Sequence, residues 1–121
     1  MTILFVCQKS EQFQSLKDAL LGQVQLQEVY SAGEALEKAK QEKIEALVCS
    51  QTLPEMEGLE LLKQLVKVNP LINTALVSDL PEKEFHEVTE GLGVLMQIPS
   101  DAGAEHGQQL LDKLAKVASL F

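Results

Sequence analysis

Short apolar runs alternate along this chain with longer stretches in which apolar residues recur at helical spacing. The first pattern is typical of buried strands, and the second is typical of amphipathic helices. Buried or short strands are predicted over residues 2–7, 44–49, 71–77 and 94–98. Apolar and polar residues alternate over residues 24–30, which predicts a half-buried or edge strand. Helices are predicted after Ser10, over residues 31–41 and 58–68, from Pro81 to the glycines at 91–93, and from Asp101 to the end.

Residues that begin and end helices support these spans. Ser10 is a candidate N-cap for the first helix, and residues 31–34 (Ser-Ala-Gly-Glu) form a capping box for the second. Residues 69–70 (Asn-Pro) end the third helix, and Pro81 suits the first turn of the fourth. The apolar stripe of the first helix consists of Phe13, Leu16 and Leu20. That of the last helix consists of Leu110, Leu114, Val117 and Phe121.

The alternation amounts to five strand–helix units in one domain spanning residues 1–121. Continuous apolar strands joined by crossover helices predict an α/β fold, a doubly wound parallel sheet with helices on both faces. In such folds a site forms beyond the carboxyl ends of the strands. The candidate segments are therefore residues 7–9, 50–57, 78–79 and 98–99.

Composition narrows the classes of function. The net charge is −8, and all ten basic residues are lysines, so no basic stripe is available to follow a nucleic acid. No apolar run approaches the roughly 20 residues of a membrane span, and the first residues lack the pattern of a signal peptide. Cys7 and Cys49 lie in apolar strand-like segments, which suits a reducing compartment. We expect a cytoplasmic protein that binds neither nucleic acid nor membrane.

A known pattern surrounds the end of the third strand. Residues 50–62 (Ser-Gln-Thr-Leu-Pro-Glu-Met-Glu-Gly-Leu-Glu-Leu-Leu) resemble the signature Asp-x-x-Met-Pro-x-Met-Asp-Gly-x-x-Leu-Leu of response-regulator receiver (CheY-like) domains. Residues 3–6, residues 31–36, Ser78 and Pro99 are similar to further family positions in the same order. The resemblance covers essentially the whole chain and implies the flavodoxin-like (βα)5 strand order 2-1-3-4-5.

The resemblance also implies a chemistry, which is phosphoryl transfer from a histidine kinase to an aspartate. Two acidic residues after the first strand hold Mg²⁺, and a hydroxyl and a lysine bind the phosphoryl oxygens. This sequence departs at most of those positions: Cys7 and Gln8 replace the acidic pair, Ser50 the aspartate, and Ile98 the lysine. Ser78 keeps the hydroxyl, and Leu95 stands at the position of the switch aromatic.

These departures predict a pseudo-receiver of bacterial two-component signalling that works through protein contacts. We expect no enzymatic activity, no cofactor and no metal, protein partners in a signalling pathway, and a monomer or weak homodimer. The alternative is that the vacated site is still used, through unconventional phosphorylation on Ser50 or Asp79 or through a small-molecule ligand. Asp79 is the carboxylate expected near the pocket mouth.

Other candidate residues have simpler interpretations. Cys7 and Cys49 are expected to be ordinary buried thiols rather than a redox pair, since alternation points Cys49 towards a helix interface. His86 and His106 are expected on the surface, without partners at metal spacing.

The third helix is apolar over about half its circumference, more than the ~100° stripe that covers a sheet. Neighbouring helices bury the excess, or an edge around Leu61 and Val68 forms a docking patch.

Overall fold

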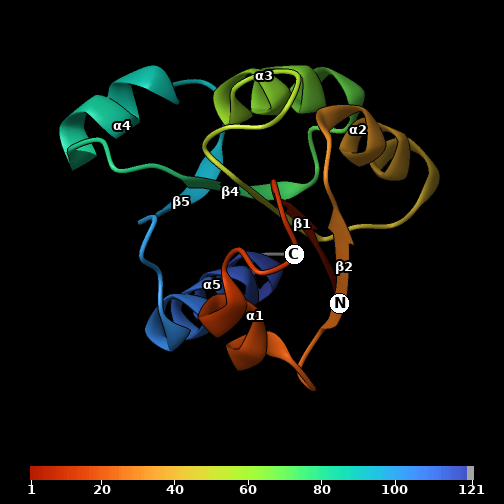
Figure 1. Cartoon of the computed structure of the whole chain (residues 1–121), viewed down its shortest axis with the longest axis vertical. Helices are drawn as coiled ribbons and strands as arrows, with labels where there is room; N and C mark the ends of the chain where they lie inside the picture. Colours follow the sequence, from red (N-terminus) through yellow and green to blue (C-terminus); the bar gives the residue numbers. More distant parts are fainter. Residues whose placement is uncertain (120–121) are drawn as a thin grey trace.

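The computed structural model describes residues 1–119, in which five strands alternate with five helices (Figure 1). In chain order the elements are β1 (Thr2–Val6), α1 (Gln14–Leu20), β2 (Gln25–Val29), α2 (Ala32–Gln41), β3 (Ala46–Cys49), α3 (Gly58–Val68), β4 (Asn73–Val77), α4 (Glu82–Val88), β5 (Val94–Ile98) and α5 (Ala104–Ser119). Within this part of the chain, no helix is long and apolar enough to cross a membrane.

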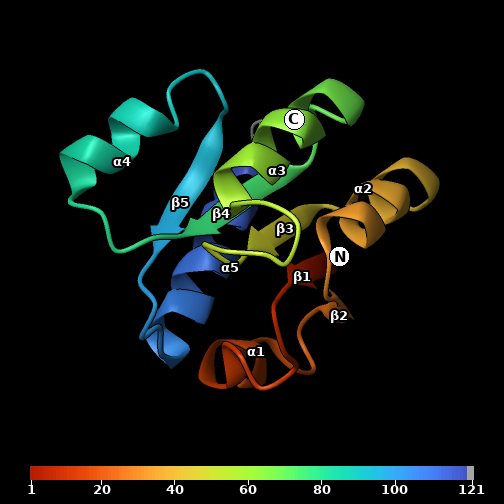
Figure 2. The ribbon, with the colours of Figure 1, turned by 45° about the horizontal axis from the view of Figure 1, so that its top comes forward.

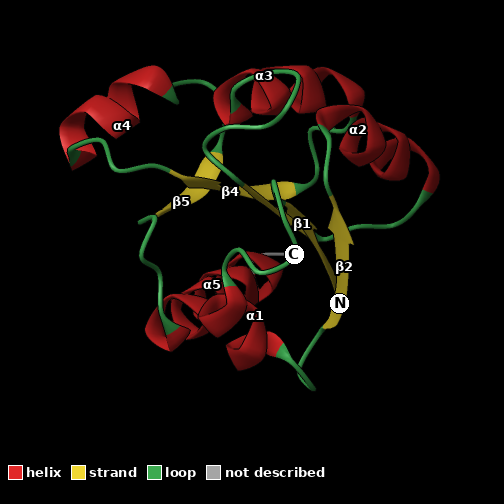
Figure 3. Ribbon diagram, in the orientation of Figure 1, coloured by secondary structure: helices red, strands yellow, loops and turns green. Residues whose placement is uncertain are grey.

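All strand pairs in the sheet are parallel, and the strand order is β2-β1-β3-β4-β5. Helices α2, α3 and α4 cover one face, and α1 and α5 cover the other (Figures 1 and 3). The predicted fold class is therefore confirmed. The arrowheads of β3, β4 and β5 point towards the same edge of the sheet in Figure 2, where the site is expected.

Alternate residues of each strand enter two separate apolar layers. Leu4 of β1 and Leu47 of β3 pack with α2, α3 and Phe85 of α4. Ile3 and Phe5 face the other way and pack with α1 and α5. This is the period-two alternation of side chains on a pleated strand, and it explains the nearly continuous apolar runs of the central strands β1 and β3.

Several predicted boundaries are confirmed. Ser31 is the N-cap of α2, and its hydroxyl oxygen accepts a hydrogen bond from the Glu34 amide at 3.2 Å. Helix α3 spans the predicted residues, with Asn69 as its C-cap. Two of the glycines after α4, Gly91 and Gly93, have positive φ angles of 82° and 66°, a conformation that favours glycine and ends the helix.

The first helix begins later than predicted, and Ser10 does not cap it. Residues 10–13 form turns, and Phe13 precedes the helix in the left-handed region with φ 59°. The Gln12 side-chain oxygen accepts hydrogen bonds from the backbone amides of Gln8 and Lys9, which closes the chain into a turn instead of a helix. Ser10 contributes its carbonyl oxygen, which accepts a hydrogen bond from Lys17 Nζ.

The last helix also begins later, at Ala104 instead of Asp101. The His106 side chain folds back over this start, and its Nδ1 accepts a hydrogen bond from the Gly103 amide at 3.0 Å. Leu110 and Leu114 are buried as the apolar stripe predicts. Phe121, the last residue of that stripe, lies outside the described residues.

The docking patch predicted on α3 is wrong for Leu61. Its side chain is fully buried, because α3 packs against α2 as well as against the sheet and so needs a wide apolar face. Val68, at the end of α3, is 37% exposed. The excess apolar surface of α3 is therefore core over most of its length.

Candidate functional site

Four of the five positions that the resemblance singles out as the phosphorylation site lie at consecutive strand ends. Cys7 follows β1, Ser50 follows β3, Ser78 follows β4, and Ile98 ends β5. Backbone hydrogen bonds join these ends: the Ser50 amide donates to the Val6 carbonyl, and the Ser78 amide donates to the Ile98 carbonyl, both at 2.9 Å. The sheet thus gathers the predicted positions along one edge.

Two of these positions belong to the hydrophobic core. Cys7 and Ile98 are fully buried in the layer between the sheet and helices α1 and α5. Burial raises the pKa of the Cys7 thiol to about 11, so the sulfur is a neutral thiol at physiological pH. Neither side chain lines the open part of the site.

The open part is a cleft of about 340 Å³. Its lining residues are Gln8, Gln12, Phe13, Ser50, Gln51, Thr52, Val77 and Ser100. Ser50 is only 4% exposed, and among the described residues its hydroxyl has no hydrogen-bond partner. Every lining side chain is uncharged at neutral pH.

This lining does not fit the magnesium ion that the resemblance implies. Mg²⁺ requires hard oxygen ligands in near-octahedral geometry and is usually held by carboxylates. No carboxylate lines the cleft within residues 1–119, and in that range no cluster of three or more His, Cys, Asp or Glu residues is placed to hold a metal ion.

The carboxylates near this edge are engaged elsewhere. Asp79, predicted at the pocket mouth, accepts a hydrogen bond from the Ser100 amide at 3.0 Å, and hydrogen bonds from Ser100 lower the pKa of its carboxyl group. Glu55 accepts hydrogen bonds from the amides of Ala32 and Gly33 at 3.1 and 3.0 Å. It therefore caps the start of α2 from a loop far along the sequence, a role that the sequence analysis missed. The same two amides lower the pKa of Glu55.

The loop between β3 and α3 folds tightly against the strand end. The Gly58 amide donates to the Gln51 carbonyl at 2.8 Å. A Cβ atom on Gly58 would lie 2.1 Å from the Ser50 carbonyl oxygen and 3.0 Å from Cys49 Sγ. Only glycine fits so close to the backbone, which explains this position of the sequence motif.

Ser78 organises the next loop. Its hydroxyl oxygen accepts a hydrogen bond from the Leu80 amide at 3.2 Å. The Gln97 side-chain amide donates to the carbonyls of Ser78 and Leu80 at 3.0 and 2.8 Å. The hydroxyl that the resemblance assigns to phosphoryl binding therefore holds the start of the β4–α4 loop.

The remaining candidates lie away from the cleft. Leu95 is half-buried and packs against the layer of α1 and α5. Cys49 is in the opposite layer from Cys7, so the sheet separates the two free thiols, and burial raises the pKa of Cys49 to about 12. His86 is exposed as predicted, whereas His106 is half-buried at the start of α5.

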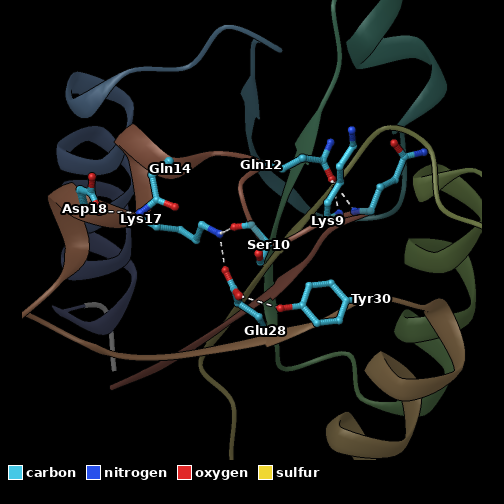
Figure 4. Close-up of polar contacts among 9 residues, drawn as sticks. Lys9, Ser10, Gln12, Gln14, Lys17, Asp18, Glu28 and Tyr30 are labelled. Carbon is cyan, nitrogen blue, oxygen red and sulfur yellow. Dashed lines mark hydrogen bonds and ion pairs between the residues drawn. The ribbon is translucent and has the colours of Figure 1, made fainter.

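A second polar cluster, missed by the sequence analysis, joins α1 to the edge strand β2 (Figure 4). Lys17 is 5% exposed, and its ammonium group contacts the Glu28 carboxylate and the Ser10 carbonyl. Tyr30 donates its hydroxyl hydrogen bond to Glu28 at 3.0 Å. The cluster lines a cleft of about 570 Å³ and fixes the loop after β1 to β2. Its charged groups are already paired with one another.

Solved structures have the same fold. A CheY-like response regulator receiver domain protein from Methanospirillum hungatei matches with a TM-score of 0.85 and 23% identity, over 99% of this chain and 98% of that one. The chemotaxis response regulator CheY4 of Vibrio cholerae matches with a TM-score of 0.77 and 16% identity, over 93% of this chain and 97% of that one. An uncharacterized protein from Neptuniibacter caesariensis matches with a TM-score of 0.83 and 21% identity, over 98% and 90%.

These likenesses define the class of fold as that of CheY-like receiver domains. No protein-family model matches the sequence, and no curated protein matches it.

Proposed function

We propose that this domain is a pseudo-receiver, a regulatory module of two-component signalling that works through protein contacts and accepts no phosphoryl group. The observation that carries the proposal is the uncharged lining of the cleft at the strand ends. Phosphoryl transfer depends on positioned cations that stabilise the charge on the transferred group. Neither a carboxylate to bind such a cation nor a lysine lines this cleft among the described residues.

The substituted positions support the same conclusion. Cys7 and Ile98 are packed into the core, where acidic or basic side chains would carry a large desolvation cost. A single reverse substitution at Ser50 would therefore rebuild only one part of the machinery. Two buried free thiols also suit a reducing compartment, and we propose the cytoplasm as the place of action.

The proposal is tested by incubating the protein with acetyl phosphate and Mg²⁺ and measuring its intact mass. We expect an unchanged mass for the wild type and for Ser50→Asp, because the metal-binding acids and the lysine are absent from both. A phosphorylation-competent receiver domain treated in parallel is the positive control. A stable added phosphoryl group on the wild type would refute the proposal, and peptide mapping would then distinguish Ser50 from Asp79.

A second candidate function is the binding of an uncharged small molecule in the same cleft. The Ser50 hydroxyl favours this function, because it lines the cleft, has no protein partner among the described residues, and can both donate a hydrogen bond to a ligand and accept one from it. A thermal-shift screen with monosaccharides and nucleosides tests this function, because a ligand bound only by the native state raises the melting temperature. A shift that Ser50→Ala removes supports the function, and a screen without any shift contradicts it.

A further inference from the structure

We infer that a groove between α3 and α4 binds a basic segment of a partner protein through one large apolar side chain. The groove has a volume of about 180 Å³, room for a single large side chain. Its walls and floor include Leu59, Leu76, Leu80 and Val88, and Glu57 is the charged residue in its lining. The inference rests on the proposed function and specifies the kind of partner.

The groove combines a buried apolar floor with exposed apolar rims. Leu76 is 4% exposed, whereas Leu80 and Val88 on the α4 side are 37% and 42% exposed. Leu59, partly buried, contributes the α3 side. An apolar side chain inserted here would remove both rims from water, and each square ångström of apolar surface buried contributes about 25 cal/mol. Apolar side chains that gather around a hollow indicate a binding surface more strongly than single ones scattered over a protein.

The rim is held in place before any partner arrives. The Leu80 amide donates to the Ser78 hydroxyl, and the Leu80 carbonyl accepts from the Gln97 side chain. Gln97 also donates to the Ser78 carbonyl, so three hydrogen bonds fix the segment that presents Leu80. A prearranged rim loses little conformational entropy on binding. Ser78, at the position that the resemblance assigns to phosphoryl binding, thus helps to hold the apolar side chain of Leu80 at the rim of the groove.

Charge around the groove selects a basic partner. Glu57 lines one side, and Glu84 lies one helical turn before Val88 on the exposed surface of α4. On the α3 side, Lys63 lies one turn after Leu59 and carries the opposite charge. Carboxylates outnumber lysines over α3, α4 and Glu57, in a chain whose net charge is −8. The five carboxylates are Glu57, Glu60, Glu82, Glu84 and Glu87, and the three lysines are Lys63, Lys67 and Lys83. Such a surface attracts Lys and Arg side chains and repels acidic segments.

Phage display tests the inference. The whole chain is immobilised, and peptides that bind it are selected from a random linear library. We expect the selected peptides to share one large apolar residue flanked by Lys or Arg. Their affinity should fall roughly tenfold or more in Leu80→Asp and in Val88→Asp, as for truncation of a central contact. Affinity should also fall in Glu57→Lys and at raised salt concentration, since exposed charges are screened.

Leu71→Asp is the matched control, because Leu71 is 88% exposed and precedes β4, at the other end of the strand from the groove. It should leave peptide affinity unchanged. Circular dichroism verifies that each variant is folded, and Glu57→Lys, a change on the surface, keeps the test available if an Asp variant unfolds. Selected peptides without basic residues, binding that survives the groove substitutions, or no enrichment at all would each overturn the inference. None of these outcomes bears on phosphorylation, so the proposed function fails or stands separately in the mass measurement.

Discussion

The pair formed by Lys17 and Glu28 gives a quantitative prediction about stability. The Lys17 side chain is 6% exposed and the Glu28 side chain 27% exposed, so the two ends of the pair differ in their access to water. Removing one partner of a buried pair costs about 3–5 kcal/mol, because the other charge is left unpaired. The size of the loss therefore depends on which partner remains.

We expect Glu28→Leu to be the more damaging change. Among the described residues, it leaves the buried Lys17 ammonium with the Ser10 carbonyl as its one hydrogen-bond partner, and the loss should lie within the full range of about 3–5 kcal/mol. Lys17→Met leaves the Glu28 carboxylate, which water reaches and to which Tyr30 still donates, so the loss should be about 2 kcal/mol. The double variant has no unpaired charge and should lie within about 1 kcal/mol of the wild type.

Urea unfolding, followed by far-ultraviolet circular dichroism, measures the free energy of unfolding of the wild type, the two single variants and the double variant. If the dependence of that free energy on urea concentration is the same in all four proteins, a shifted midpoint is a true change in stability. The predicted result is a double-variant loss far smaller than the sum of the single losses. Additive losses would refute the reasoning, since they would mean that the two side chains contribute independently. A larger loss for Lys17→Met than for Glu28→Leu would refute the argument from exposure.

Three further predictions follow from local geometry. In urea unfolding, Gly58→Ala should lower the free energy of unfolding by about 1–3 kcal/mol, because the new Cβ would clash with the Ser50 carbonyl. Gly33→Ala, whose Cβ would have its nearest atom at 3.8 Å, should be neutral or stabilise by up to about 1 kcal/mol. Equal effects of the two substitutions would contradict the packing argument. Because the pKa of Glu55 is lowered in the folded protein, its carboxylate stabilises the fold above the ordinary glutamate pKa. The difference in unfolding free energy between the wild type and Glu55→Gln should therefore shrink as the pH falls through the lowered pKa. A difference that does not depend on pH would contradict this role of Glu55. Cys7 and Cys49, with pKa values raised to about 11 and about 12, should react with a thiol reagent at the rate of unfolding, and immediate labelling of the native protein would contradict their burial.

The fold was predictable because each element carries its own local signal. Buried parallel strands are nearly continuous apolar runs, and α2 has a side-chain cap within its own first turn. The start of α1 was not predictable, because it depends on Gln12 accepting from two backbone amides and on a left-handed Phe13. Serine is a common N-cap residue, but Ser10 does not cap α1, because residues 10–13 form turns before the helix begins.

The candidate site was predictable in position and only partly in detail. Parallel strands bring Ser50, Ser78 and Ile98 to one edge whatever their side chains are. Which side chains stay open to solvent depends on packing across the sheet, and no local pattern reveals that. Glu55 illustrates the limit: its partners lie 22 and 23 residues away, and a glutamate in a loop carries no signal that it will cap another helix.

The position of Tyr30 has a consequence for spectroscopy. The chain contains one tyrosine and no tryptophan, so tyrosine emission comes from a ring beside the edge strand β2, hydrogen-bonded to Glu28. Tyrosine emission therefore reports on the surroundings of the edge strand β2, whereas far-ultraviolet circular dichroism averages over the whole backbone. Coincident curves from the two probes would mean that the edge and the core unfold together. An earlier change in emission would reveal local opening around β2 and α1, the part of the sheet held by the charged pair.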